Sequence, residues 1–192
     1  MAKRLFDLIV ALTGLIVLSP LLIAIALAVK LSSPGPVFFR HERVGRRFRP
    51  FRVIKFRTMT VNNAGPQVTA RDDARITPFG RILRQTKLDE LPQLFNVLAG
   101  SMSLVGPRPE VMEFVDRYRR DYEEILTVRP GITDEASIHF RDEERILAEA
   151  GDPQQVYIDE VLPRKIELAK HYVRHRSFAG DLAIIVRTLA SL

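Results

Sequence analysis

The hydrophobic pattern divides the chain into a long apolar segment near the N-terminus and a more polar remainder. Residues 5–31 are strongly apolar, and positions 8 to 29 form a run of 22 residues without a charged side chain. One helix of this length can span a bilayer. The run is too long for the apolar region of a signal peptide, and no small-residue cleavage site follows it. We therefore expect a membrane helix.

A break is expected in the middle of this segment, at Ser19 and Pro20. Proline removes a backbone donor and clashes with the preceding turn. Lys3 and Arg4 precede the segment and further cations follow it, so the positive-inside bias draws both ends to the cytoplasmic side. A helix that bends at Ser19-Pro20 and returns fits both observations. An ordinary kinked span, in which proline is also frequent, fits the hydropathy equally well.

The remainder of the chain alternates between strand and helix patterns. Residues 37–39 and 52–57 are typical of strands and would be joined around Gly45. Helical patterns recur at residues 110–126, 153–176 and 177–192. The apolar stripe of the last helix suits either a membrane surface or the core. We predict an α/β, mostly helical domain with a small strand region and amphipathic surface helices. It is not a Rossmann-type domain, because no Gly-rich nucleotide fingerprint is present.

The charge balance adds an anionic partner to this picture. The 192 residues, enough for one domain plus a membrane element, carry 29 Lys and Arg against 23 Asp and Glu. Eight cations lie between Arg40 and Arg57 against a single acid, Glu42. Phenylalanines between them would suit single-stranded nucleic acid, but the position after a membrane segment favours anionic headgroups or a phosphate substrate. The absence of cysteine excludes disulfides and thiol nucleophiles.

The candidate chemistry centres on the adjacent acids Asp89 and Glu90. Apolar residues at helical spacing follow them, and Gly100 is a plausible end of that helix. Asp89 occupies the expected N-cap position, where the helix dipole favours an ionised carboxylate. An ionised and positioned aspartate can act as a covalent nucleophile. Local spacing alone is explained more simply by a helix cap and an acid that complements the dipole.

Several cations are candidates for binding phosphate near this pair. Arg84 precedes the acids by about one helical turn, and Gly106-Pro107-Arg108-Pro109 forms a stiff turn that fixes a guanidinium. The candidate set is Arg84, Arg108, Arg129, Lys55 and Arg57. The alternatives are an ion pair with the acids for Arg84 and a solvated strand face for the strand cations.

The string KLDELPQLFNVL at residues 87–98, followed by residues 100–109, closely resembles the bacterial sugar-transferase family. Asp89 and Glu90 fall on the aspartate–glutamate dyad of that family. The similarity continues at residues 55–59, 79–81, 84, 129–133 and 177–182. Residues 134–144 depart from the pattern that commonly follows Gly-Ile-Thr, so no nucleotide or sugar specificity is carried over through this loop.

The resemblance implies a small monotopic phosphoglycosyltransferase at the cytoplasmic face of the bacterial inner membrane. Residues 1–33 would form a re-entrant membrane helix, and residues 34–192 a cytosolic catalytic domain at the membrane surface. The implied reaction moves a phosphosugar from a UDP-sugar to polyprenyl (undecaprenyl) phosphate and releases UMP, the first membrane step of glycoconjugate synthesis. Asp89 would be the nucleophile and the contact to an Mg²⁺ cofactor, and Glu90 would orient either of them.

The expected partners are the UDP-sugar, the polyprenyl phosphate and membrane lipids, without nucleic acid; an oligomer is possible. Two other classes of function remain as alternatives. A membrane-anchored nucleic-acid-binding protein would need the cations from Arg40 to Arg57 but not Asp89. A structural scaffold with a degenerate site would not need the intact dyad.

Overall fold

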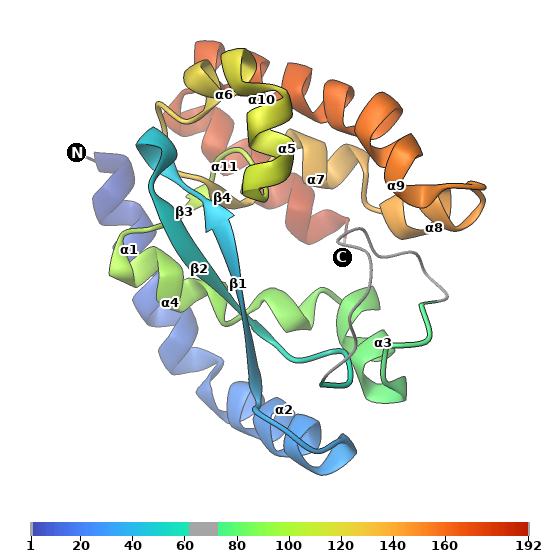
Figure 1. Cartoon of the computed structure of the whole chain (residues 1–192). Coiled ribbons are helices and arrows are strands. Elements are labelled where there is room, and N and C mark those ends of the chain that lie inside the picture. The colour runs from blue at the N-terminus through green and yellow to red at the C-terminus, as the bar shows by residue number, and fades with distance from the viewer. Residues whose placement is uncertain (1, 62–72, 192) are drawn as a thin grey trace.

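The computed structural model describes residues 2–61 and 73–191. Its strands form two separate pairs, β1 (Phe38–Val44) antiparallel to β2 (Pro50–Phe56), and β3 (Ser103–Val105) parallel to β4 (Gly131–Thr133). Helices make up most of the remaining regular structure around these pairs (Figure 1). The prediction of a mostly helical α/β domain with a small strand region is confirmed. The hairpin of β1 and β2 is longer than its sequence pattern indicated.

The helices are, in chain order, α1 (Ala2–Val17), α2 (Ser19–Ser32), α3 (Pro78–Gln85), α4 (Gln93–Ala99), α5 (Met112–Arg117), α6 (Arg119–Ile125), α7 (Glu135–His139), α8 (Glu143–Ala148), α9 (Pro153–Val156), α10 (Leu162–His175) and α11 (Phe178–Ala190). The single helix expected at residues 110–126 is wrong, because the chain breaks at Tyr118 between α5 and α6. The Tyr118 hydroxyl donates a hydrogen bond to the carbonyl of Ile158, which fixes the break.

The apolar N-terminal segment is two helices joined at a sharp bend. The axes of α1 and α2 differ by 64°. Pro20 lies in the first turn of α2, where its missing N–H has no intrahelical partner to lose. The Ser19 hydroxyl donates to the carbonyl of Ile16 at 2.7 Å and so satisfies an acceptor near the break. The predicted break at Ser19-Pro20 is confirmed.

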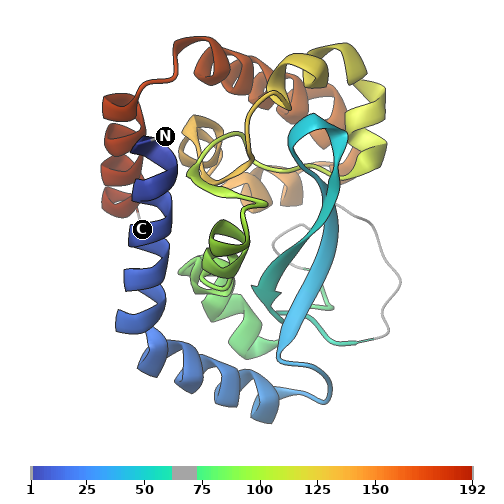
Figure 2. The same cartoon turned by 90° about the vertical axis from the view of Figure 1, so that its left-hand side faces the viewer.

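The bent pair runs along one edge of the molecule (Figure 2). Within the described residues no single helix is long and apolar enough to cross a membrane, whereas α1 and α2 together meet that test by length and composition. Both helices expose large apolar side chains on one side, among them Leu12 and Ile16 of α1 and Leu27 and Leu31 of α2. Such a continuous apolar face is typical of a membrane-contacting surface.

The opposite side of α1 belongs to the protein core. Ala11 is completely buried, and it packs in a cluster with Leu94 and Val97 of α4 and Leu104 of β3. α11 lies beside α1 (Figure 2), where the rings of Phe6 and Phe178 meet edge to face at 5.3 Å. Most of the apolar stripe expected on the last helix does not pack on the core, because α11 buries Ile184 but exposes Leu182, Val186 and Leu189.

The parallel pair β3 and β4 places two backbones unusually close together. A Cβ added at Gly131 would collide with the backbone nitrogen and oxygen of Gly106. The Gly131 N–H donates to the carbonyl of Pro107, and the Gly106 N–H donates to that of Thr133. The strand pair therefore requires glycine at position 131, and it holds the turn that leads to Arg108.

We predict that Gly131→Ala destabilises the protein by roughly 2–3 kcal/mol, because backbone atoms must move to admit the methyl group. Thermal unfolding of the protein in detergent or lipid measures the change. The matched control is Gly151→Ala, whose added Cβ meets no atom within 4 Å. Equal melting temperatures for the two variants would contradict the close approach.

Candidate active site

The acid pair lies in a short 3₁₀ turn, Leu88–Glu90, between α3 and α4. Thr77 caps α3 by accepting a hydrogen bond from the Gly80 N–H. The chain then reverses at Lys87, which has a left-handed φ of 56°. This backbone conformation costs free energy in a residue other than glycine, and such residues are concentrated at functional sites. The reversal turns Asp89 and Glu90 into the molecule.

The prediction that Asp89 caps a helix is wrong. α4 begins at Gln93, Pro92 precedes it, and no side chain caps it. Asp89 is buried, with 7% of its surface exposed. Burial raises the pKa of the Asp89 carboxyl, the charge of Lys55 opposes this rise, and that of Glu90 adds to it. The helix N-terminus therefore does not account for an ionised Asp89 in this structure.

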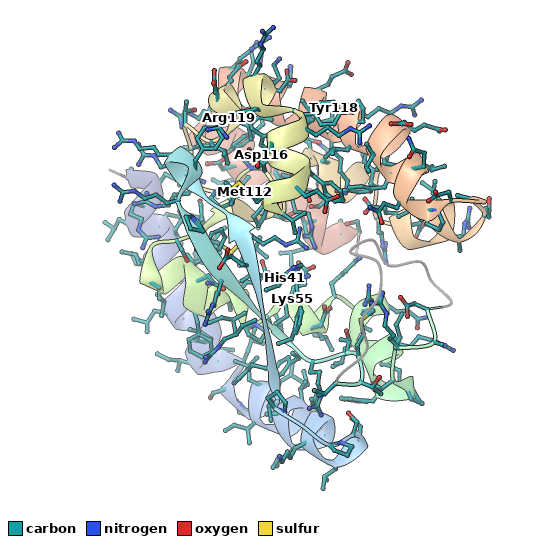
Figure 3. The ribbon with its side chains drawn as sticks, viewed as in Figure 1. His41, Lys55, Met112, Asp116, Tyr118 and Arg119 are labelled. Atoms are coloured by element: carbon teal, nitrogen blue, oxygen red, sulfur yellow. The ribbon has the colours of Figure 1, made fainter. Side chains whose placement is uncertain are left out.

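Glu90 accepts hydrogen bonds from two cations on different elements. Lys55 Nζ of β2 lies 2.7 Å from Oε1, and the Arg108 guanidinium binds both carboxylate oxygens, with Nη1 at 3.2 Å from Oε2. Figure 3 labels Lys55 beside His41 near the middle of the molecule. Burial acts to raise the pKa of Glu90, but the charges and hydrogen bonds of Arg108 and Lys55 outweigh it, so the pKa lies well below its usual range.

The backbone around each partner of Glu90 is itself fixed. The Arg108 N–H donates to Asp134 at 3.0 Å, and the same carboxylate caps α7 by accepting from the Ser137 N–H. On the hairpin side, the buried amide of Asn96 accepts from the Ile54 N–H and donates to the carbonyl of Arg52. The sequence did not indicate the roles of Asn96 and Asp134, because each side chain acts through hydrogen bonds to segments that are distant in sequence.

A cationic cleft of about 290 Å³ lies near the dyad, bordered by Lys87. It is lined by Ile76, Arg81, Arg84, Gln85, Lys87, Arg141, Asp142 and Arg145. Five of these side chains are cationic and one is acidic. The charges of Arg84 and Lys87 lower the pKa of Asp89, so they act on the same carboxylate. Arg84 is thus at the site, as predicted.

Sequence reasoning missed two cations of this cleft, Arg141 and Arg145. Arg141 precedes α8 and Arg145 lies within it. The acids at positions 142–144 lie between the two arginines, so the local charge balance does not indicate a cationic site. The segment that departs from the family pattern therefore contributes Arg141 to the cleft, and Arg145 follows directly after it.

Two predicted phosphate ligands lie apart from the dyad. Arg57 is buried, and its Nη2 donates to the carbonyls of Val29 and Ser33, so it caps the end of α2. Arg129 Nε donates to the carbonyl of Gly100 at the far end of α4, and the seven-residue α4 rises about 10 Å. The structure brings Lys55, Arg84 and Arg108 to the dyad and gives Arg57 and Arg129 other partners.

The expected Mg²⁺ would need oxygen ligands at the dyad. The described residues hold no cluster of three His, Asp or Glu side chains that could bind a metal. Asp89 Oδ1, however, is buried without a hydrogen-bond partner among them. Mg²⁺ commonly binds one or two carboxylates together with substrate phosphates, so the unpartnered carboxylate oxygen of Asp89 fits that ion.

Comparisons with known proteins identify the family of this chain. A family model described as "Bacterial sugar transferase" matches residues 1–192. A UDP-N-acetylgalactosamine-undecaprenyl-phosphate N-acetylgalactosaminephosphotransferase of Aeromonas hydrophila is 39% identical over 99% of this chain and 43% of its own length. A UDP-glucose:undecaprenyl-phosphate glucose-1-phosphate transferase of Caulobacter vibrioides is 40% identical over 99% of this chain and 69% of its own.

The exopolysaccharide production protein ExoY of Sinorhizobium fredii is 34% identical over 100% of this chain and 85% of its own length. The chain spans 43% of the Aeromonas relative and 38% of a Xanthomonas campestris glucose-1-phosphate transferase, so the longest relatives carry sequence that it does not match. The family model and these identities cover this chain essentially from end to end, and the chain therefore belongs to the bacterial sugar transferase family.

Proposed function

We propose that this protein transfers a phosphosugar from a UDP-sugar to undecaprenyl phosphate, giving undecaprenyl diphosphosugar and UMP. The observation that carries the proposal is the buried Asp89, whose Oδ1 has no partner in the described chain. Arg84 and Lys87, whose charges act on this carboxylate, line a cleft together with three other cations. The named activities of relatives that match nearly the whole chain support the same reaction. Both substrates are anionic, which agrees with the cationic cleft.

We infer a double displacement through Asp89. A carboxylate oxygen of Asp89 attacks the sugar-linked phosphorus, the bond from that phosphorus to the bridging oxygen breaks, and UMP leaves with the electron pair. A phosphate oxygen of undecaprenyl phosphate then attacks the enzyme-bound phosphorus and releases the carboxylate. Covalent catalysis of this kind divides one difficult step into two easier ones. A bound Mg²⁺ would neutralise charge on the diphosphate.

The surrounding residues have separate tasks in this reaction. Glu90, held by Lys55 and Arg108, fixes the turn that carries Asp89. Arg84 and the cations of the cleft bind the diphosphate and stabilise the charge that develops on the leaving phosphate. Lys55 and Arg108 bind Glu90, the neighbour of the nucleophile. The exposed part of the Arg108 side chain is available to a phosphate.

The same proposal includes a location at the cytoplasmic face of the bacterial inner membrane. The apolar outer faces of α1 and α2 are exposed, and the lipid substrate must present its phosphate at the membrane surface. α1 begins beside α11 and α2 leads directly into the hairpin (Figure 2). Both ends of the bent pair are thus attached to the same domain, which supports a re-entrant segment rather than a span.

The nucleic-acid-binding alternative has less support. Of the cations between Arg40 and Arg57, Arg43 pairs with Glu110, Arg46 donates to the carbonyl of Thr127, and Arg57 caps α2. These contacts leave fewer of the cations for a phosphate backbone. The relatives reported above are named for sugar-phosphate transfer or polysaccharide production.

The test of the proposal is UMP release from a panel of UDP-sugars by purified protein in lipid, with undecaprenyl phosphate and Mg²⁺. We predict that Asp89→Asn abolishes this release, because the amide cannot act as an anionic nucleophile. The variant should fold and melt at the parent temperature or above it. A buried carboxylate with an unpartnered oxygen costs folding free energy that the neutral amide avoids.

The control for this variant is Asp116→Asn, which replaces an exposed acid that pairs only with Arg119 on the surface helices. It should release UMP at the parent rate. Activity of the parent with none of the UDP-sugars would contradict the proposed function. Near-parental release by Asp89→Asn, with an active parent, would contradict the covalent mechanism alone.

We predict that Glu90→Gln lowers turnover at least tenfold, or about 1.4 kcal/mol in the barrier. It should also lower the free energy of unfolding by roughly 2 kcal/mol at neutral pH, because charge-assisted hydrogen bonds from Lys55 and Arg108 are weakened. The pKa of Glu90 is depressed, so its ion pairs stabilise the fold above the ordinary carboxyl range. The stability difference should therefore shrink as the pH falls below about 4.

Chemical denaturation at several pH values and steady-state kinetics measure the two effects of Glu90→Gln. The matched control is Glu124→Gln, which weakens an exposed ion pair with Arg174 and should change neither quantity appreciably. Parental turnover in Glu90→Gln would show that Glu90 contributes only to stability.

We predict that a cysteine introduced at Ala2 is protected, in intact cells, from a thiol reagent that cannot cross the inner membrane. Ala2 is exposed at the start of α1, and the chain contains no other cysteine. Labelling after the cells are permeabilised is the positive control. Labelling of intact cells would place the N-terminus outside and contradict the re-entrant arrangement.

A further inference from the structure

A buried polar network lies on α1, away from the dyad and outside every role assigned above. Asp7 is only 2% exposed although it is an acid in a mostly apolar helix. Its Oδ2 accepts a hydrogen bond from the Ser103 hydroxyl at 2.7 Å, and its Oδ1 accepts from the Leu104 N–H at 3.4 Å. A buried carboxylate is costly unless it is paired, so Asp7 binds its helix specifically to β3.

The network continues to the last helix of the chain. Lys3 Nζ lies 2.7 Å from Asp181 Oδ2 and 4.0 Å from Asp7 Oδ1, so one cation serves two buried acids. The Tyr172 hydroxyl donates to the other oxygen of Asp181 at 2.8 Å. Arg4, the neighbour of Lys3, points to the carbonyls of Leu98 and Met102 just before β3. These contacts join α1, α11 and β3.

β3 is the strand that leads to Arg108. The segment from Ser103 to Arg108 is hydrogen-bonded along its length to residues 130–134, through the N–H groups of Ser103, Gly106 and Arg108. We therefore treat it as a short rigid unit. Ser103, which contacts Asp7, is five residues from Arg108, whose guanidinium binds Glu90. A displacement of Ser103 cannot be absorbed before it reaches Arg108.

We propose that Asp7 is a positioning residue for the reaction, which acts through Ser103 and β3 to hold Arg108 on Glu90. The proposal rests on the proposed function of the dyad. In this arrangement, the helix that contacts the membrane also sets the geometry of the catalytic acids. The network therefore holds α1 against β3, and through β3 it also makes the rate of turnover depend on the position of α1.

The test is a double-mutant cycle in the full chain, reconstituted in lipid, with the UDP-sugar that supports UMP release. Asp7→Ala removes both acceptors, whereas Asp7→Asn keeps an oxygen for the Ser103 hydroxyl and the Leu104 N–H. We expect kcat to fall about tenfold or more in Asp7→Ala and less than about threefold in Asp7→Asn, with the KM for the UDP-sugar changed less than about threefold in both.

The Arg108→Lys background shows whether Asp7 acts through Arg108, because lysine keeps the positive charge but loses the bidentate contact with Glu90. If Asp7 acts through Arg108, Asp7→Ala lowers kcat less than about twofold further in that background. An equal loss in both backgrounds overturns the proposal and leaves Asp7 with a structural role only. Parental kcat in Asp7→Ala overturns it as well.

Two further variants keep the test decisive. Asp121→Asn weakens a 2.7 Å ion pair between α6 and Lys170 of α10, a pair that makes no contact with Asp7 or Ser103 in the described part of the chain, and it should keep kcat within about twofold of the parent. If Asp7→Ala fails to fold, Ser103→Ala, which removes one hydroxyl, enters the same cycle with the same criteria. A parent that releases UMP from no UDP-sugar refutes the proposed function, whereas an active parent with independent effects refutes only this inference.

Discussion

The ion-paired carboxylate of Glu90 is the interaction on which the site depends. It joins three parts of the chain that are distant in sequence, because Lys55 comes from the hairpin, Arg108 from the turn after β3, and Glu90 from the turn between α3 and α4. The two cations stabilise the ionised form of Glu90 by more than desolvation destabilises it, so the pKa of Glu90 is depressed. Burial outweighs the nearby charges at Asp89, so the pKa of Asp89 is raised. Adjacent carboxyls with opposite environments suit different roles.

This division of roles explains why the two acids need different surroundings. Glu90 is saturated with donors and fixes geometry, whereas Asp89 keeps an oxygen free of partners within the described chain. In the proposed mechanism Asp89 forms a bond to phosphorus, which requires an oxygen that is not already engaged by a lysine or an arginine. The left-handed turn at Lys87 is the local strain that presents both side chains inward. The electrostatic stabilisation of the turn by Glu90 offsets that strain.

Sequence patterns predicted the features that depend on local chemistry. The break at Ser19-Pro20 and the end of α4 at Gly100, with its left-handed φ of 85°, follow from proline and glycine stereochemistry alone. The roles of Arg57 and Arg129 did not follow, because a guanidinium beside a turn can bind a carbonyl as readily as a phosphate. The cap assigned to Asp89 failed because a 3₁₀ turn replaced the first turn of the expected helix. The pairing of β3 with β4 depends on contacts between segments that no local pattern records.

The contact between Lys3 and Asp181 has a consequence for truncated forms of the protein. These residues are far apart in sequence, and their helices complete one shared core, to which α1 contributes Ala11 and α11 contributes Ile184. A chain cut between α10 and α11 would leave Lys3 without its 2.7 Å partner and α1 without one wall of its core. Proteolysis in that connection should therefore loosen α1, although this helix lies at the opposite end of the sequence from the cut.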